Sequence, residues 1–147
     1  MDLLFLRLVN IIGKIIMKEI EEVKETKTLA LDFDGVCVTN ENYPGIGKDI
    51  GAIPVLKKIL AKGNRIILWT RRDGFALDNA VKWFKDNNIE LAGINKMPGK
   101  GGGSPKIDAD VFIDDKGLGA PLTHSSSGKP YINWTLASAY LRKKGLI

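Results

Sequence analysis

From residue 28 onward, apolar segments of strand length alternate with amphipathic segments of helix length, and this alternation constrains the fold most. Four segments have the pattern of strands, at residues 28–32, 65–70, 89–94 and 110–114, and three have the pattern of helices, at residues 51–62, 75–87 and 132–143. Continuous apolar strands are typical of a parallel sheet that is covered on both faces. The alternation therefore predicts an α/β fold with a doubly wound, Rossmann-like parallel sheet in three layers.

The length of the chain fits one such unit. A chain of 147 residues with 44% apolar residues can bury a core of its own, and the sequence contains no internal repeat. We therefore assign residues 25–147 to a single domain and residues 1–24 to an N-terminal amphipathic helix or extension.

The N-terminal segment, residues 3–16, is strongly apolar, but a polar stripe interrupts it at helical spacing: Arg7, Asn10, Lys14 and Lys18. The segment is too short to span a bilayer, and the acidic Asp2 before it does not fit a secretory signal. We therefore expect no transmembrane segment and a cytoplasmic protein. Three interpretations stay open: a helix docked on the domain or on a sister subunit, a helix on a membrane surface, or an upstream extension with the native start at Met17.

Charge and residue usage limit the chemistry. The net charge is +5 and is spread along the chain, which favours an anionic partner such as a phosphorylated metabolite, a nucleic acid or a lipid headgroup. With one cysteine, Cys37, and one histidine, His124, the chain can form neither an internal disulfide nor a multi-cysteine zinc site nor a histidine cage. Carboxylates must carry the chemistry, and Cys37, between two valines, is expected in the core.

Residues suited to phosphate or metal chemistry follow three of the four predicted strands. Asp32 and Asp34 follow the first strand, Thr70 ends the second, and Asp114 and Asp115 follow the last. Open parallel sheets bind ligands outside the carboxyl ends of their strands. The alternative, a set of helix caps and turn acids, explains any one of these residues better than all of them together.

The four aspartates predict a cation site. Asp32 and Asp34 are two residues apart, so their side chains lie on one side of an extended chain and repel each other unless a cation or a shared proton holds them. Oxygen ligands without histidine or cysteine suit a hard ion such as Mg²⁺. We predict Mg²⁺ as the cofactor, with Asp32, Asp34, Asp114 and Asp115 as its ligands.

The same residues resemble a known family, the haloacid dehalogenase-like (HAD) phosphatases. Residues 29–36, with the sequence Leu-Ala-Leu-Asp-Phe-Asp-Gly-Val, are similar to its first motif, and residues 66–70 are similar to its second, an apolar strand ending in Thr or Ser. Lys106 fits the lysine of the third motif, with Lys96 and Lys100 as rivals, and residues 111–115 fit the fourth motif in its paired-aspartate form. The motifs occur in the family's order and spacing.

The resemblance implies a Mg²⁺-dependent phosphoric monoester hydrolase. Asp32 would attack phosphorus and become an aspartyl phosphate, and Asp34 would act as general acid and then as general base. Asp32 would bind the metal through its carboxylate, Asp34 through its backbone carbonyl, Asp114 through its side chain and Asp115 through water.

The phosphate-binding residues that the resemblance implies are Thr70 and Lys106, which would bind the transferring oxygens. Arg71 and its neighbour Arg72 are placed to meet further anionic groups of a substrate. Neither interval that holds a cap domain in larger relatives is long enough here to build one. We therefore expect a small capless phosphatase with an open site, a phosphorylated small-molecule substrate and a possible homo-oligomer.

Other motifs fit these residues less well. A calcium loop starting at Asp32 would need Glu rather than Tyr43 at its twelfth position. Residues 99–104 lack the Gly-Lys-Ser/Thr of a P-loop, and a receiver domain would place its acid pair and phospho-acceptor in a different order. A non-catalytic binding module with this fold, and a phosphatase that acts on nucleic-acid ends, stay open as alternatives, although a nucleic-acid partner is the less favoured one.

Overall fold

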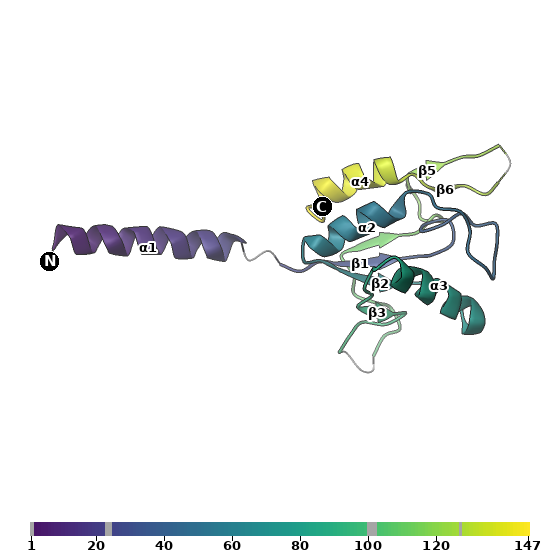
Figure 1. Cartoon of the computed structure of the whole chain (residues 1–147), viewed down its shortest axis with the longest axis horizontal. Helices are drawn as coiled ribbons and strands as arrows, with labels where there is room; N and C mark the ends of the chain where they lie inside the picture. Colours follow the sequence, from purple (N-terminus) through teal and green to yellow (C-terminus); the bar gives the residue numbers. More distant parts are fainter. Residues whose placement is uncertain (1, 23–24, 100–102, 127) are drawn as a thin grey trace.

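The structure is a computed structural model of the whole chain, and it describes residues 2–22, 25–99, 103–126 and 128–147. Its centre is a four-stranded sheet in the order β3-β2-β1-β4 with every neighbouring pair parallel (Figure 1). The strands are β1 (Thr28–Leu31), β2 (Arg65–Leu68), β3 (Gly93–Ile94) and β4 (Val111–Ile113). This arrangement confirms the predicted mixed α/β fold with a Rossmann-like parallel sheet.

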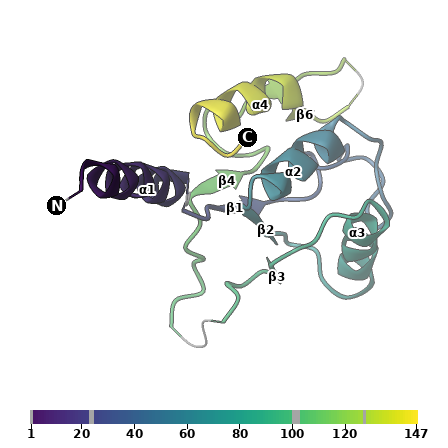
Figure 2. The ribbon, with the colours of Figure 1, turned by 60° about the vertical axis from the view of Figure 1, so that its left-hand side comes forward.

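One face of the sheet carries three helices, α2 (Ala52–Ala61), α3 (Gly74–Asp86) and α4 (Trp134–Lys143). Alternate residues of a strand point to the same face, and on this face Leu29 and Leu31 join Ile66 and Leu68 in the main core. The apolar sides of all three helices pack into the same core, and Figures 1 and 2 show α2 and α4 on the same side of the sheet. Cys37 is fully buried there, as expected.

The opposite face is covered differently. Ala30 and Ile67, which point to it, pack with Ile107 in a small second cluster, and Met97 and Ala109 lie at its edge. These covering residues belong to the segment between β3 and β4, and among the described residues no helix lies on this face. The predicted third layer, and with it the doubly wound arrangement, is therefore not confirmed. The glycines and prolines of residues 98–105 disfavour a helix at this point of the chain.

Two details of the secondary structure differ from the sequence-based expectation. The third strand is only two residues long rather than residues 89–94, because Asn88 and Ile89 still belong to the cap that ends α3. Asn88 takes a φ of 56°, and the amide of Ile89 donates to the carbonyl of Phe84. The segment between the last predicted strand and the last predicted helix contains a strand, β5 (Leu122–Thr123), which pairs antiparallel with β6 (Tyr131–Ile132).

The N-terminal helix α1 (Leu3–Glu22) is longer than the apolar segment that predicted it and extends away from the sheet (Figure 1). Its side chains from Leu3 to Ile20 are exposed, apart from the half-buried position of Gly13. Docking of this helix on its own domain, one of the three interpretations, is therefore not what the structure shows. No helix in the described part of the chain combines the length and apolarity that a membrane span requires.

Candidate functional site

The sheet places the acidic residues at one edge. Leu31 of β1 pairs with Ile113 of β4, so the next residues, Asp32 and Asp114, leave the sheet side by side. The amide of Asp32 donates to the carbonyl of Ile113 at 3.0 Å, which continues the ladder by one step. This pairing is the structural reason that two acids 82 positions apart in the chain become neighbours.

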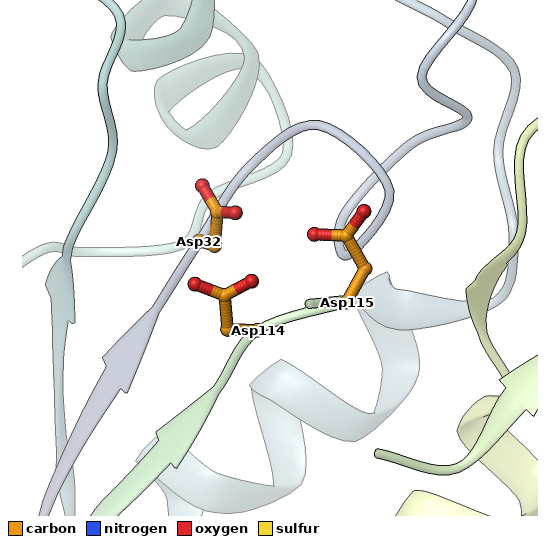
Figure 3. Close-up of side chains that lie close together, drawn as sticks. All are labelled: Asp32, Asp114 and Asp115. Carbon is orange, nitrogen blue, oxygen red and sulfur yellow. The ribbon is translucent and has the colours of Figure 1, made fainter. Parts of the chain in front are cut away.

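Three of the four predicted metal ligands form a cluster. Carboxylate oxygens of Asp32, Asp114 and Asp115 lie within 4.8 Å of one another, and all three side chains are partly buried. Figure 3 shows them facing a common space, with Asp32 beyond the end of one strand and the pair beyond the end of the next. Opposite oxygens around Mg²⁺ lie about 4 Å apart, given metal–oxygen distances of about 2.1 Å. The donor set and its spacing therefore fit a hard divalent cation after a small inward movement.

The protonation of the cluster follows from its crowding. Burial raises the pKa of Asp32 to about 7, and the charges of Asp114, Asp115 and Asp34 raise it too, while the hydrogen bond from the Phe33 amide opposes them. Burial also raises the pKa of Asp115, with the hydrogen bond and the charge of Asp114 acting in the same direction. Without a cation, full ionisation of the three carboxylates is unfavourable, because they are partly buried and repel one another.

Gly35 makes the close packing of this cluster possible. It adopts a φ of +78°, a conformation that favours glycine. A methyl group at its Cα would lie 2.5 Å from Oδ2 of Asp115. Glycine at position 35 therefore has two roles. It allows the backbone conformation of the turn, and it leaves space for the side chain of Asp115.

The fourth acid, Asp34, contacts a cation of the protein. Its two carboxylate oxygens accept hydrogen bonds from Nε and Nη2 of Arg72, both at 2.7 Å. Asp34 therefore lines the same cavity but is not in the three-carboxylate cluster. A metal contact through its backbone carbonyl, as predicted from the family resemblance, stays a prediction.

Arg72 is buried and its donors are fully used. Besides the two bonds to Asp34, Nη1 donates to the carbonyls of Pro44 and Ala76, and Nη2 donates to that of Gly45. A guanidinium has five N–H donors, so none is left for a substrate. The expectation that Arg72 meets an anionic substrate is therefore wrong in this conformation, because the fold uses it to hold Asp34.

These residues line a cavity of about 690 Å³, and most of the predicted site residues lie in its lining. Thr70 lines it beside the acids; the hydroxyl of Thr70 accepts a bond from the Arg72 amide, and its own amide donates to the side chain of Asn95. The hydroxyl proton of Thr70 stays available for an anion. The lining residues are Asp32, Asp34, Asn40, Tyr43, Trp69, Thr70, Arg71, Arg72, Asn95, Pro105, Asp114, Asp115 and Lys116.

The predicted phosphate-binding cations divide into two groups. Arg71 is exposed and lines the cavity. Lys106 is also exposed, but only its neighbour Pro105 reaches the lining, and its rival Lys96 lines a different cavity. The other rival, Lys100, lies outside the described residues.

A lysine that the sequence analysis did not consider, Lys116, lines the cavity instead. Its charge lowers the pKa of Asp115, against the larger effects that raise it, so it acts on the cluster directly. Its position immediately after the Asp114–Asp115 pair was the available signal.

A solved structure is similar to this chain. Neither a family model nor a curated protein matches the chain. A solved structure, that of a conserved protein coded by a locus from Bacteroides thetaiotaomicron, is 33% identical, covers 82% of this chain and 93% of its own, and superposes with a TM-score of 0.65. That description names no activity. At this identity and coverage, the chain belongs to the same family as the conserved Bacteroides thetaiotaomicron protein.

Proposed function

We propose that this protein is a Mg²⁺-dependent phosphatase of the haloacid dehalogenase-like type, a capless single-domain member that hydrolyses a phosphate monoester through an aspartyl phosphate. The observation that carries the proposal is the three-carboxylate cluster of Asp32, Asp114 and Asp115 in the same cavity as Asp34 and Thr70. The cavity is thus lined by the residues proposed as nucleophile, acid/base group and anion-binding hydroxyl, which supports the proposal.

In the first step, an oxygen of Asp32 forms a bond to phosphorus while the bond from phosphorus to the ester oxygen breaks. Asp34, which takes up a proton from solvent before this step, gives it to the leaving oxygen, which departs as an alcohol. In the second step, Asp34 takes a proton from a water molecule that attacks phosphorus, and the bond between phosphorus and Asp32 breaks to release phosphate.

The ion pair with Arg72 is compatible with this role for Asp34. A carboxylate offers about four lone-pair positions, and the contacts at its two oxygens use two of them. The side chain of Asp34 is 20% exposed, whereas that of Arg72 is 2% exposed. Arg72 therefore holds the carboxylate from the buried side, and the remaining lone pairs are available on the side of the cavity.

The cation would be held by the carboxylates of Asp32, Asp114 and Asp115, whose oxygens have the chemistry and spacing for it. When bound, Mg²⁺ supplies positive charge against the phosphoryl oxygens and the crowded carboxylates. Two of the cations that line the cavity, Arg71 and Lys116, together with the hydroxyl of Thr70, would orient the remaining phosphoryl oxygens. An open cavity of this size suits a phosphorylated small molecule.

The test is hydrolysis of para-nitrophenyl phosphate by the purified full chain. Activity should require Mg²⁺, disappear with EDTA, and fall by orders of magnitude in Asp32→Asn. Asp108→Asn is the matched control, because Asp108 is exposed and does not line the cavity. A wild-type chain that binds Mg²⁺ but turns over no phosphate ester would favour the non-catalytic binding module. Full activity in Asp32→Asn would refute the assignment of the nucleophile.

A further inference from the structure

We propose that α1 docks on an anionic lipid surface, with its axis in the plane of the membrane. The first observation is an uncovered apolar surface. Helix α1 has twelve large apolar side chains between Leu3 and Ile20, and each of them is between 48% and 67% exposed. Soluble proteins seldom leave an apolar surface of this extent uncovered, and such surfaces mark protein or membrane contacts.

The second observation is the arrangement of side chains around the helix. At about 100° per residue, the polar residues between positions 4 and 18 fall within about 80° of the circumference, and the apolar ones occupy about 240°. The polar arc consists of Arg7, Asn10, Lys14 and Lys18, and residues 3–18 contain no acid. Over residues 3–18 the polar arc therefore carries positive charge only, which complements an anionic headgroup layer. The acids of α1, Glu19, Glu21 and Glu22, follow in its last turn, so the proposed contact is made by residues 3–18.

The width of the apolar arc favours lipid over a second copy of this helix. A paired helix covers a narrow seam, so a dimer would leave much of the arc in water. A lipid interface covers the whole arc, and the long side chains of Arg7, Lys14 and Lys18 reach the headgroups from the remaining stripe. A spanning orientation does not fit, because no described helix combines the length and the apolarity of a membrane span and Arg7 and Lys14 would enter the hydrocarbon.

The experiment uses the full chain and vesicle sedimentation. Vesicles of an equimolar mixture of phosphatidylcholine and phosphatidylglycerol are compared with vesicles of phosphatidylcholine alone. Each basic residue near an anionic surface contributes about fivefold in binding. The triple variant Arg7→Gln, Lys14→Gln, Lys18→Gln should therefore bind the mixed vesicles on the order of a hundredfold more weakly.

A matched triple variant controls for net charge. Lys57→Gln, Lys58→Gln and Lys62→Gln remove the same charge from exposed positions of the domain, and this variant should bind like the wild type. Ile12→Gln with Ile16→Gln, at the centre of the apolar arc, should abolish binding to both vesicles. Far-UV circular dichroism in solution should be the same for all of them, since none of these positions is buried.

Three results would overturn the proposal. One is equal binding to neutral and mixed vesicles, which would remove the role of the basic stripe. Another is an equal loss in the two triple variants, which would assign the effect to overall charge. The last is an oligomer by light scattering at micromolar concentration that does not bind vesicles and becomes monomeric in the Ile12→Gln, Ile16→Gln variant; it would identify a second copy as the occupant.

Discussion

The carboxylate of Asp34 and the guanidinium of Arg72 form a two-point ion pair, with Nε–Oδ2 and Nη2–Oδ1 distances of 2.7 Å. The pair joins the segment after β1 to the segment after β2. Arg72 also lies 4.9 Å from the ring centre of Phe33 and 5.2 Å from that of Tyr43. The guanidinium of Arg72, with all its donors in hydrogen bonds, therefore holds the carboxylate of Asp34, the proposed acid/base group.

We expect Arg72→Lys to destabilise the protein although it keeps the charge. An ammonium group has three donors and cannot reproduce the planar guanidinium, so the bonds from Arg72 to the carbonyls of Pro44, Gly45 and Ala76 cannot all be kept. Breaking a buried pair of this kind costs about 3 kcal/mol. Urea denaturation measures the loss, and phosphatase activity should fall with it because Asp34 is no longer held.

The exposed ion pair between Lys82 and Asp86 provides the control. Lys82→Gln should cost less than about 1 kcal/mol, since exposed pairs contribute little. If Arg72→Lys proved no more costly than Lys82→Gln, the structural role assigned to Arg72 would be wrong.

Gly35→Ala should weaken metal binding by displacing Asp115. The added methyl would lie 2.5 Å from Oδ2 of Asp115, and the backbone conformation itself costs about 1 kcal/mol for a non-glycine residue. Gly63→Ala separates the two effects, because Gly63 has a φ of +83° but no atom within 4 Å of the added methyl. Calorimetric titration with Mg²⁺ should show weaker binding for Gly35→Ala alone, although both variants lose stability. Equal affinities would contradict the role of Gly35.

That Asp32 and Asp114 lie close together was predictable from the sequence alone, because the carboxyl ends of parallel strands lie at the same edge of a sheet. The sequence could not predict the partner of Asp34. Arg71 and Arg72 are adjacent and chemically identical, and both line the cavity. Only the fold decides that Arg71 stays exposed, whereas Arg72 is buried against Phe33, Tyr43 and three backbone carbonyls. These groups come from segments whose approach has no local sequence signal.

What covers the second face of the sheet could not be predicted, for a related reason. Apolar strands such as residues 28–31 indicate that both faces are covered, but not what covers them. Here Ile107 packs against Ala30 and Ile67 from a segment without helical periodicity. The same segment contains Lys106. Because the sequence does not predict the path of this segment, it could not predict whether Lys106 reaches the phosphate site.

The raised pKa of Asp32 predicts how stability depends on pH. Burial raises it from 3.8 to about 7 in the folded protein, so between these values the folded state binds more protons than the unfolded state. The resulting stabilisation is complete below about pH 4 and is lost as the pH rises through about 7. In EDTA, the melting temperature of Asp32→Asn should therefore exceed that of the wild type at pH 8.

Mg²⁺ should reverse this ordering. Cation binding requires ionised carboxylates, so added Mg²⁺ should raise the melting temperature of the wild type more at pH 8 than at pH 5, and that of Asp32→Asn much less. Thermal unfolding at both pH values, with Mg²⁺ and with EDTA, measures all four combinations. An increase that is the same at both pH values would argue against a metal site at Asp32.

The choice between Lys116 and Lys106 can be decided by kinetics. Lys116 lines the cavity and its charge acts on Asp115, whereas Lys106 is exposed outside the lining. A hydrogen bond to a charged group contributes about 1.5 kcal/mol or more, so Lys116→Met should lower kcat/KM for para-nitrophenyl phosphate by about tenfold or more. Lys106→Met should change it less than about twofold, as expected for a solvated lysine. The opposite pattern would return the role to Lys106, and would mean that the segment carrying it moves to the cavity when phosphate binds.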